Sequence, residues 1–234
     1  MILTITAISD THTRHSLVTK DLPGGDIIIH AGDFMSSGYY KSEVQDFCKW
    51  FDSLDYGAKI FIAGNHDRLF EDSPEKAMDI VNSHKWIDYL QDSNIQYAQG
   101  EDNPINIWGS PWQPEFYNWA FNLPRMGEDL REKWSLIPIE TDILVTHGPP
   151  YSYLDLSGYG NVKCGCELLL DRVMTVKPKI HIFGHVHGSY GYKFNGTTHF
   201  INAAVLNEQY KYRNKPLTFT WDADTNEIEF FPKI

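Results

Sequence analysis

The sequence has little cysteine and no long apolar run, and both shortages limit where the protein can work. Only three cysteines occur in 234 residues, and one close pair among an odd number is not a disulfide framework. We interpret Cys164-Gly-Cys166 as a loop cysteine followed by one packed under a helix, rather than as a redox or metal pair. No apolar stretch approaches the ~20 residues of a membrane helix, and no basic segment followed by an apolar one opens the chain. We therefore expect a soluble, cytoplasmic protein with no membrane partner.

Positive charge is also scarce. The chain has 20 Lys and Arg residues against 31 Asp and Glu residues, which gives a net charge of -11, and it contains no run of Lys or Arg. Such a chain lacks the broad positive field that holds polymeric nucleic acid or anionic lipid. We therefore expect no strong binding of nucleic-acid polymers, which leaves a small molecule as the expected partner.

The composition is that of a folded chain, with 42% hydrophobic and 22% charged residues. A chain of this length can bury roughly 70% of its unfolded surface. It has no fixed-period repeat and no clear linker, so we predict a single domain over residues 1–234. We expect that domain to include an irregular, aromatic-rich insertion at about residues 85–140 and a C-terminal hairpin region at 190–234.

Short apolar, β-branched runs alternate with helical patterns, which predicts an α/β fold. Runs typical of buried strands are Ile2–Ile8, Asp26–Ile29, Lys59–Ala63, Ile143–Thr146 and Ile180–Phe183. Apolar spacing predicts helices over Ser42–Leu54, from Ser73-Pro74 onward, and over Cys166–Val176. Turn sequences predict two hairpins, one joining Tyr190–Phe194 to Thr197–Ile201 and one joining Leu217–Trp221 to Ile228–Phe231.

Metal-competent side chains follow each of the five buried strands. In chain order these clusters are Asp10-Thr11-His12, Gly32-Asp33, Gly64-Asn65-His66-Asp67, His147-Gly148 and Gly184-His185-Val186-His187. In open α/β sheets, ligands bind at the carboxyl ends of the strands. The sequence therefore places its candidate ligands where such folds bind theirs.

The residue types in these clusters suit two borderline divalent ions. Residues two apart in an extended chain point the same way, so Asp10 and His12 can bind one ion together. His185 and His187 can face one site for the same reason. Imidazole, carboxylate and amide oxygen together suit Mn, Fe, Zn, Ni or Co, whereas an all-carboxylate, water-rich site would have indicated Mg.

Each cluster also has a purely structural interpretation. Asp10 or Asp33 after a strand is commonly a helix cap or turn residue, and a lone His147 is more often a hydrogen-bonded residue than a ligand. The complete ordered set favours a metal site, because it supplies the structural context that a single motif lacks. Five histidines have no such support, and we interpret them as structural: His15, His30, His84, His181 and His199.

At these residues the sequence resembles the calcineurin-like metallophosphoesterase superfamily, whose pattern is DxH, GD, GNH[DE], a histidine after a strand, and GHxH. All five blocks are present in that order over residues 10–187. The stretches SDTHTRH, IHAGDF, GNHD, THGPP and KPKIHIFGHVHGSYG are most similar to the MPPED-like branch of small metallophosphodiesterases. Some members of that branch carry glycine in place of the first histidine of GHxH. His185 is present here, so full two-metal occupancy is expected.

The resemblance implies the fold and the residue roles. The fold would be a four-layer α/β/β/α sandwich of two mixed β-sheets flanked by helices. Seven residues would hold the two divalent ions, Mn foremost: Asp10, His12 and His187 for the first, Asn65, His147 and His185 for the second, and Asp33 bridging both. His66 would sit over the phosphate and assist the leaving group, and Asp67 would orient it.

The resemblance implies a hydrolase that cleaves a small phosphoester by attack of a metal-bridging hydroxide. Its leading form is a phosphodiesterase acting on small phosphodiesters or cyclic nucleotides. A phosphomonoesterase, a protein phosphatase and a nuclease of the same fold remain alternatives, and so does a non-catalytic scaffold that retained the fold. Substrate choice is expected to depend on the interval between Asn65 and His147, where Trp112, Phe116, Tyr117 and Trp119 are candidates for stacking and, more simply, for packing.

Overall fold

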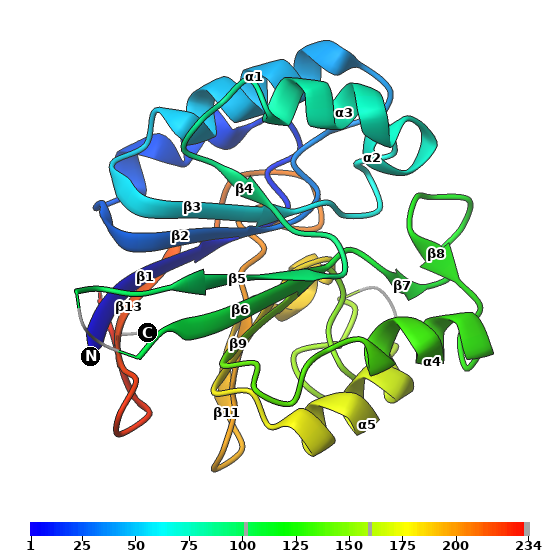
Figure 1. The fold of residues 1–234 in the computed structure, drawn as a ribbon. Coiled ribbons are helices and arrows are strands. Elements are labelled where there is room, and N and C mark those ends of the chain that lie inside the picture. The colour runs from blue at the N-terminus through cyan, green and yellow to red at the C-terminus, as the bar shows by residue number, and fades with distance from the viewer. Residues whose placement is uncertain (101–102, 159–160, 232–234) are drawn as a thin grey trace.

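Two mixed β-sheets face each other, and helices cover the outer side of each (Figure 1). The computed structural model describes residues 1–100, 103–158 and 161–231. In spatial order the first sheet contains β14 (Glu227–Phe230), β13 (Leu217–Asp222), β1 (Ile2–Ile8), β2 (Gly25–Ala31), β3 (Tyr56–Ile62) and β4 (Asp88–Tyr89). The second contains β11 (Gly191–Phe194), β12 (His199–Asn202), β10 (Ile180–Phe183), β9 (Ile143–Thr146), β6 (Ile105–Ser110) and β5 (Ser93–Tyr97). A separate short pair joins β7 (Gln113–Pro114) to β8 (Asn122–Leu123).

The central strands of both sheets run parallel, and antiparallel strands lie toward the edges. In the first sheet β1 to β4 are parallel neighbours, whereas β13 is antiparallel to both β1 and β14. In the second sheet β12, β10, β9 and β6 are parallel neighbours, with β11 and β5 antiparallel at the two edges. Parallel central strands end at the same edge of their sheet, which is why the segments that follow them can meet.

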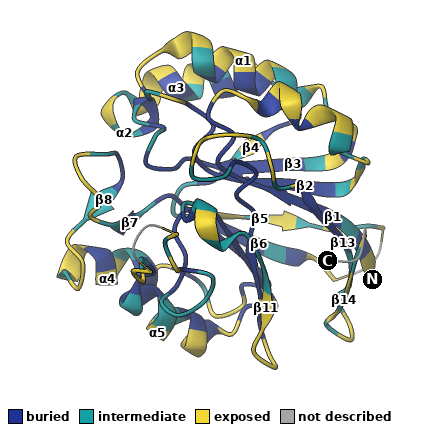
Figure 2. Ribbon diagram, turned by 180° about the vertical axis from the view of Figure 1, so that it is seen from behind, coloured by how far each residue is buried: buried dark blue, intermediate teal, exposed yellow. Residues whose placement is uncertain are grey.

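The helices form the two outer layers. Over the first sheet lie α1 (Lys41–Asp52), α2 (Leu69–Asp72) and α3 (Pro74–Val81), and over the second lie α4 (Glu128–Ser135) and α5 (Glu167–Val176) (Figure 1). Three short 3-10 helices complete the elements: His15–Leu17, Thr19–Asp21 and His187–Ser189. Figure 2 shows the helices exposed on their outer faces and the central strands buried between the layers.

Local sequence explains where the helices begin and end. The buried face of α1 carries Val44, Phe47, Cys48 and Phe51, the spacing of an amphipathic helix. Pro74 opens α3 at its first position, where a missing N–H costs nothing. At α5, the Cys166 thiol accepts a hydrogen bond from Leu169 N at 3.4 Å and so caps the helix. Its other end is the left-handed residue Lys177, one position before Pro178.

Three apolar layers hold the sandwich together. Phe47 and Phe61 belong to the layer between the first sheet and α1 to α3. Ile29 and Ile182 belong to the layer between the two sheets, and Trp134 belongs to the layer beneath α4 and α5. All five side chains are buried, and each fully buried aliphatic or aromatic side chain of this kind contributes about 1.5–3 kcal/mol.

The observed architecture confirms the predicted α/β/β/α sandwich. The five predicted strands and three predicted helices are present within a few residues of their expected bounds, and both predicted hairpins form. The segment at 85–140 is more regular than its sequence suggests, because β5 is a full member of the second sheet. Residues 101–102 of that segment and 232–234 of the hairpin region lie outside the described residues. In the part of the chain described, no helix has the length and apolar character that crossing a membrane requires.

Two of the histidines interpreted as structural are fully buried inside the layers. His30 on β2 pairs with the Thr11 hydroxyl at 3.0 Å and lies among phenylalanine rings. His181 on β10 pairs with the Thr146 hydroxyl at 2.8 Å. Burial lowers the pKa of each from 6.5 to about 3, so both are neutral in the folded protein near pH 7.

These two histidines make the fold acid-sensitive. Below pH 6.5 these two imidazoles bind protons in the unfolded chain but stay neutral in the folded chain until the pH approaches 3. The free energy of unfolding therefore decreases as the pH falls from 6.5 toward 3. In urea unfolding with EDTA present, lowering the pH from near 7.5 to about 5 should cost wild type about 2 kcal/mol per buried histidine. His181→Gln should lose less over that interval, while the control His84→Gln, at a partly exposed site, should follow wild type. Equal losses for wild type and His181→Gln would refute this origin of the acid sensitivity.

Candidate dinuclear metal centre

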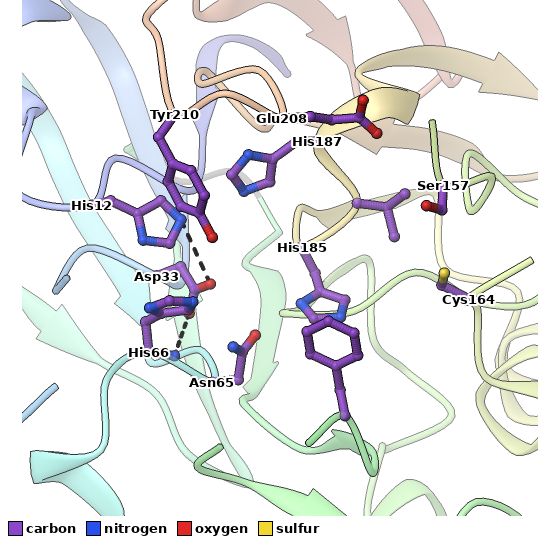
Figure 3. A pocket seen from close by; sticks show the side chains of 12 residues that line it. His12, Asp33, Asn65, His66, Ser157, Cys164, His185, His187, Glu208 and Tyr210 are labelled. Atoms are coloured by element: carbon purple, nitrogen blue, oxygen red, sulfur yellow. Dashed lines mark hydrogen bonds and ion pairs between the residues drawn. The ribbon is translucent and has the colours of Figure 1, made fainter. Parts of the chain in front are cut away.

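The segments that follow β1, β2, β3, β9 and β10 meet at one edge of the two sheets and bring together the predicted metal ligands (Figure 3). Backbone hydrogen bonds join these segments: Asp10 N donates to Gly32 O at 3.0 Å, and Gly184 N donates to His147 O at 2.9 Å. The same segments are strained. Four ligand residues have left-handed backbone, with φ of 56°, 40°, 58° and 65° at Asp10, His12, Asp33 and His185. Such conformations cost about 1–3 kcal/mol each and persist only where surrounding contacts impose them.

One group of ligands consists of Asp10, His12 and His187, whose ligand atoms all lie within 4.8 Å of one another. His187 Nε2 lies 3.2 Å from Asp10 Oδ1. His12 Nε2 is buried and has no hydrogen-bond partner among the residues that the structure describes. A buried nitrogen without a partner is unfavourable unless something else binds it, so this group fits a cation.

The other group consists of Asp33, His147 and His185, again within 4.8 Å, with Asn65 beside it. His147 Nε2 lies 3.3 Å from Asp33 Oδ2 and 2.9 Å from Asn65 Oδ1. The same Asp33 Oδ2 lies 3.9 Å from His12 Nε2 of the first group. Asp33 therefore lies between the two groups, the position expected of a bridging carboxylate.

Backbone carbonyls orient three of the imidazoles. The Nδ1 atoms of His12, His147 and His187 donate to the carbonyls of Met35, Ala31 and Asn207 at 3.2, 2.9 and 3.0 Å. A carbonyl can only accept a hydrogen bond, so each Nδ1 carries the proton and Nε2 is the nitrogen left for a metal. The rings are thus held in the orientation that coordination needs.

The electrostatics of the site also suit a cation. Burial raises the pKa of Asp10 and of Asp33, but the neighbouring imidazoles together outweigh it, His187 foremost at Asp10 and His147 foremost at Asp33, and hold the pKa of both carboxyls below its usual range. Burial lowers the pKa of His147 and of His187, but the neighbouring carboxylates and a backbone carbonyl at each ring together outweigh it and raise each pKa to about 9. Protons therefore take the positions that metal ions would take, which supports the donor set as a cation site.

Burial dominates at the remaining two imidazoles of the ligand set. It lowers the pKa of His12 to about 4 and that of His185 to about 3, so both are neutral near pH 7. A neutral imidazole is the form that binds a metal. His12 and His185 are therefore ready to coordinate without losing a proton.

Glycine is required beside the ligands because the chain packs against the carboxylates there. A Cβ at Gly184 would lie 2.1 Å from Asp10 Oδ2. One at Gly64 would lie 2.4 Å from Asp33 Oδ1 and 2.6 Å from Asp33 N. Any side chain at either position would displace a ligand.

His66 and Asp67 have different surroundings. The His66 ring stacks on Trp119 at 4.0 Å between centroids, and its Nδ1 lies 2.6 Å from Ser36 O. Its ring nitrogen also lies within 4.8 Å of the ligand atoms of His12 and Asp33, so His66 sits beside the first group.

The expectation that Asp67 orients His66 needs correction. The Asp67 carboxylate accepts hydrogen bonds from the backbone N–H groups of Asp33, Met35 and Gly64 at 2.8, 2.8 and 2.7 Å. The Ser36 carbonyl is what holds the His66 ring. Asp67 instead fixes the backbone of the two segments that deliver Asp33 and Asn65, because its buried carboxylate is aimed at their N–H groups.

A cavity of about 230 Å3 opens over the ligands, and we call it the metal-side cavity (Figure 3). Several of its lining residues were not predicted to belong to the site: Ser157, Cys164, Val186, Glu208 and Tyr210. The Tyr210 ring lies 4.9 Å from His12 and 5.4 Å from His187. Its neighbour Arg14 donates to the Tyr210 carbonyl, a contact that anchors the loop.

The four aromatic residues considered for stacking have different surroundings. Phe116 lines the metal-side cavity, and its ring stands edge-on to His185 at 5.4 Å. Trp119 stacks on His66, whereas Trp112 donates to Asp92 at 2.9 Å. Tyr117 is 82% exposed. Only Phe116 and Trp119 therefore touch the ligands or His66.

Comparison with known proteins defines the class to which this site belongs. The family model described as calcineurin-like phosphoesterase matches residues 3–189. That span contains all nine residues predicted for the site, and the chain belongs to this family of metallophosphoesterases.

Similar proteins narrow the branch of the family. Metallophosphoesterase domain-containing protein 1 of Homo sapiens is 41% identical over 231 residues, an alignment that covers 90% of this chain and 68% of the human protein. UPF0046 protein T07D4.2 of Caenorhabditis elegans is 38% identical over 250 residues, covering 96% of this chain and 61% of the relative. The predicted MPPED-like resemblance is confirmed, and the chain spans roughly two thirds of these relatives' length.

Solved structures agree on the fold. TT1561 of Thermus thermophilus has a TM-score of 0.64 at 16% identity, covering 98% of each chain. Phosphopantetheinyl hydrolase of Mycobacterium tuberculosis has a TM-score of 0.61 at 16% identity, covering 88% of this chain and 90% of that one. Identities this low establish a shared fold and nothing finer.

The corrected role of Asp67 can be tested by metal retention. Asp67→Asn puts an NH2 group where backbone N–H donors need an acceptor, so the segments carrying Asp33 and Asn65 should shift. Metal content after dialysis, measured by elemental analysis, should fall well below that of wild type. The exposed Asp46→Asn is the matched control and should retain its metal. Full metal retention by Asp67→Asn together with low activity would instead support a role on His66.

Proposed function

We propose that the protein is a two-metal phosphodiesterase that hydrolyses small phosphodiesters, cyclic nucleotides among them. The observation that carries this proposal is the pair of ligand groups that share Asp33 and open into one cavity beside His66. Two-metal sites of this kind act on phosphate esters. Membership of the family implies a phosphoester hydrolase, and the proposal adds that the bond cleaved is that of a phosphodiester.

Two divalent ions bound here would activate a water as the nucleophile and would stabilise charge on the phosphoryl oxygens. The chain supplies their positions. Asp33 lies between the two groups, and the carbonyl of Ala31 keeps the Nε2 atom of His147 directed at its carboxylate. Asp33 Oδ1 also accepts a hydrogen bond from His66 N at 2.7 Å, which ties the candidate acid to the bridging ligand.

His66 is the candidate general acid. Its Nδ1 faces the Ser36 carbonyl, which leaves Nε2 as the nitrogen that can donate a proton to the departing oxygen. Stacking against Trp119 fixes the plane of the ring. His66 therefore has an oriented ring with one nitrogen left for an alkoxide leaving group, which supports the acid role.

The donor set is compatible with Mn, Fe, Zn, Ni and Co, and the family resemblance makes Mn the leading candidate. Four imidazoles, two carboxylates and one amide oxygen surround the two positions. Magnesium prefers a site made entirely of oxygen ligands, whereas imidazole suits the later metals. Elemental analysis of purified protein tests this choice.

The expected partner is a small phosphoester rather than a polymer. Two arginines of this region are engaged with the protein itself: Arg14 bonds the Tyr210 carbonyl, and Arg125 bonds the Gly165 carbonyl and pairs with Glu167 at 3.0 Å. The net charge of -11 disfavours a nucleic-acid strand further. The three cysteines are free thiols, which is consistent with the proposed cytoplasmic location.

The alternatives make different predictions for one substrate panel. Diester, monoester and cyclic-nucleotide substrates should be tested with Mn, Ni, Co, Zn and Mg in turn. A phosphodiesterase should prefer the diesters, whereas a phosphomonoesterase or protein phosphatase would prefer the monoesters. No hydrolysis of any phosphoester by protein that carries two metals would favour a non-catalytic scaffold.

His66→Ala separates the acid role from metal binding. The variant should retain its metals, because the Nε2 atoms of the ligand histidines are held by other carbonyls. Turnover of a diester with a poor leaving group should fall by about 10²–10⁴-fold, the usual contribution of general acid catalysis. A p-nitrophenyl diester should lose much less, since its leaving group needs no proton. An equal loss for both substrates would contradict the acid role.

A further inference from the structure

A second cavity of about 240 Å3 adjoins the metal-side cavity. Three residues, Phe116, Cys164 and His185, line both cavities and form the wall between them. The remaining lining of the second cavity is largely apolar, with faces from Trp112, Pro114, Trp134, Pro149 and Leu169. A part of the ligand that extends past Phe116 would therefore lie away from the candidate metal ligands and in apolar surroundings.

Two side-chain atoms of these lining residues, Gln113 Oε1 and Trp134 Nε1, are buried without a hydrogen-bond partner among the described residues. Surrounding protein atoms cover both of them, so neither atom identifies an occupant of the cavity.

Three charged residues line the second cavity: Glu115, Arg125 and Lys163. Both cations are engaged elsewhere, because Arg125 pairs with Glu167 at 3.0 Å and Lys163 donates to Ser152 Oγ at 2.8 Å. Glu115 is exposed and acidic. The apolar walls and this acidic residue suit a flat, uncharged group rather than a second phosphate.

The position of the second cavity identifies which part of a substrate can reach it. His66, the candidate acid for the leaving group, lines the metal-side cavity and lies next to His12 and Asp33. The second cavity is bounded by His185, which belongs to the other ligand group. Figure 3 shows His66 and His185 on opposite sides of Asn65. A leaving group protonated by His66 therefore points away from the second cavity.

We propose that the second cavity binds the ester group that stays on phosphorus, and that this group is flat, uncharged and apolar. This inference rests on the proposed phosphodiesterase function, because a phosphomonoester has no such group. The cavity gives the enzyme a reason to prefer diesters: the retained substituent contributes binding that a monoester cannot.

Two diesters with the same leaving group test the inference. Methyl p-nitrophenyl phosphate and 1-naphthyl p-nitrophenyl phosphate both release p-nitrophenolate, so they differ only in the retained group. Burying the naphthyl ring should lower KM about tenfold or more relative to the methyl diester. Val162 lines the second cavity but not the metal-side cavity, and it is 58% exposed. Val162→Trp should therefore fill the second cavity without disturbing the core. That variant should lose the naphthyl preference and keep wild-type kcat/KM on the methyl diester, while the isosteric control Val162→Thr keeps both.

The outcomes separate this inference from the proposed function. Equal KM values for the two diesters in wild type would overturn the role of the second cavity and leave the phosphodiesterase proposal standing. A naphthyl preference that survives Val162→Trp would also overturn it. Hydrolysis of p-nitrophenyl phosphate with no hydrolysis of either diester would overturn the phosphodiesterase proposal itself, and the inference with it.

Discussion

The buried Asp33 carboxylate is the interaction on which the rest of the site depends. It is 2% exposed, and a buried charge costs several kcal/mol unless other groups compensate it. Its Oδ2 lies 3.3 Å from His147 and 3.9 Å from His12, and its Oδ1 accepts from His66 N. These three partners follow different strands and belong to both sheets. The charge of the carboxylate is therefore compensated only when the two sheets pack together correctly at this edge. Two cations sharing Asp33 would satisfy the same requirement more strongly than protons do.

Backbone strain and close packing follow from this constraint. The residue that carries the carboxylate is itself left-handed, with φ of 58° at Asp33. Asp67 holds it there by accepting from its N–H group, and Gly64 leaves room for its side chain. A site that stores strain in this way needs its supporting contacts as much as its ligands. Asp67 is therefore as much a part of the centre as the residues that face the metals.

The grouping of the candidate ligands was expected from the family resemblance, which rests on residues that the sequence displays. Asp10, His12 and His187 were expected in one group, and that group forms. The partners of Asp67 could not be predicted, since motif order does not reveal whether a carboxylate faces a side chain or the backbone. Similarly, β5 was taken for irregular chain because its residues are only half-buried and carry no apolar run.

The arrangement also explains how an acidic protein can act on an anionic substrate. Its charge of -11 is spread over the chain, whereas the cavity collects imidazoles around two carboxylates. The most direct test of this account is anomalous X-ray diffraction from crystals grown with Mn2+. The account predicts two peaks about 3.5–4 Å apart, one on each side of Asp33. A single peak, or two peaks that do not share Asp33, would contradict it.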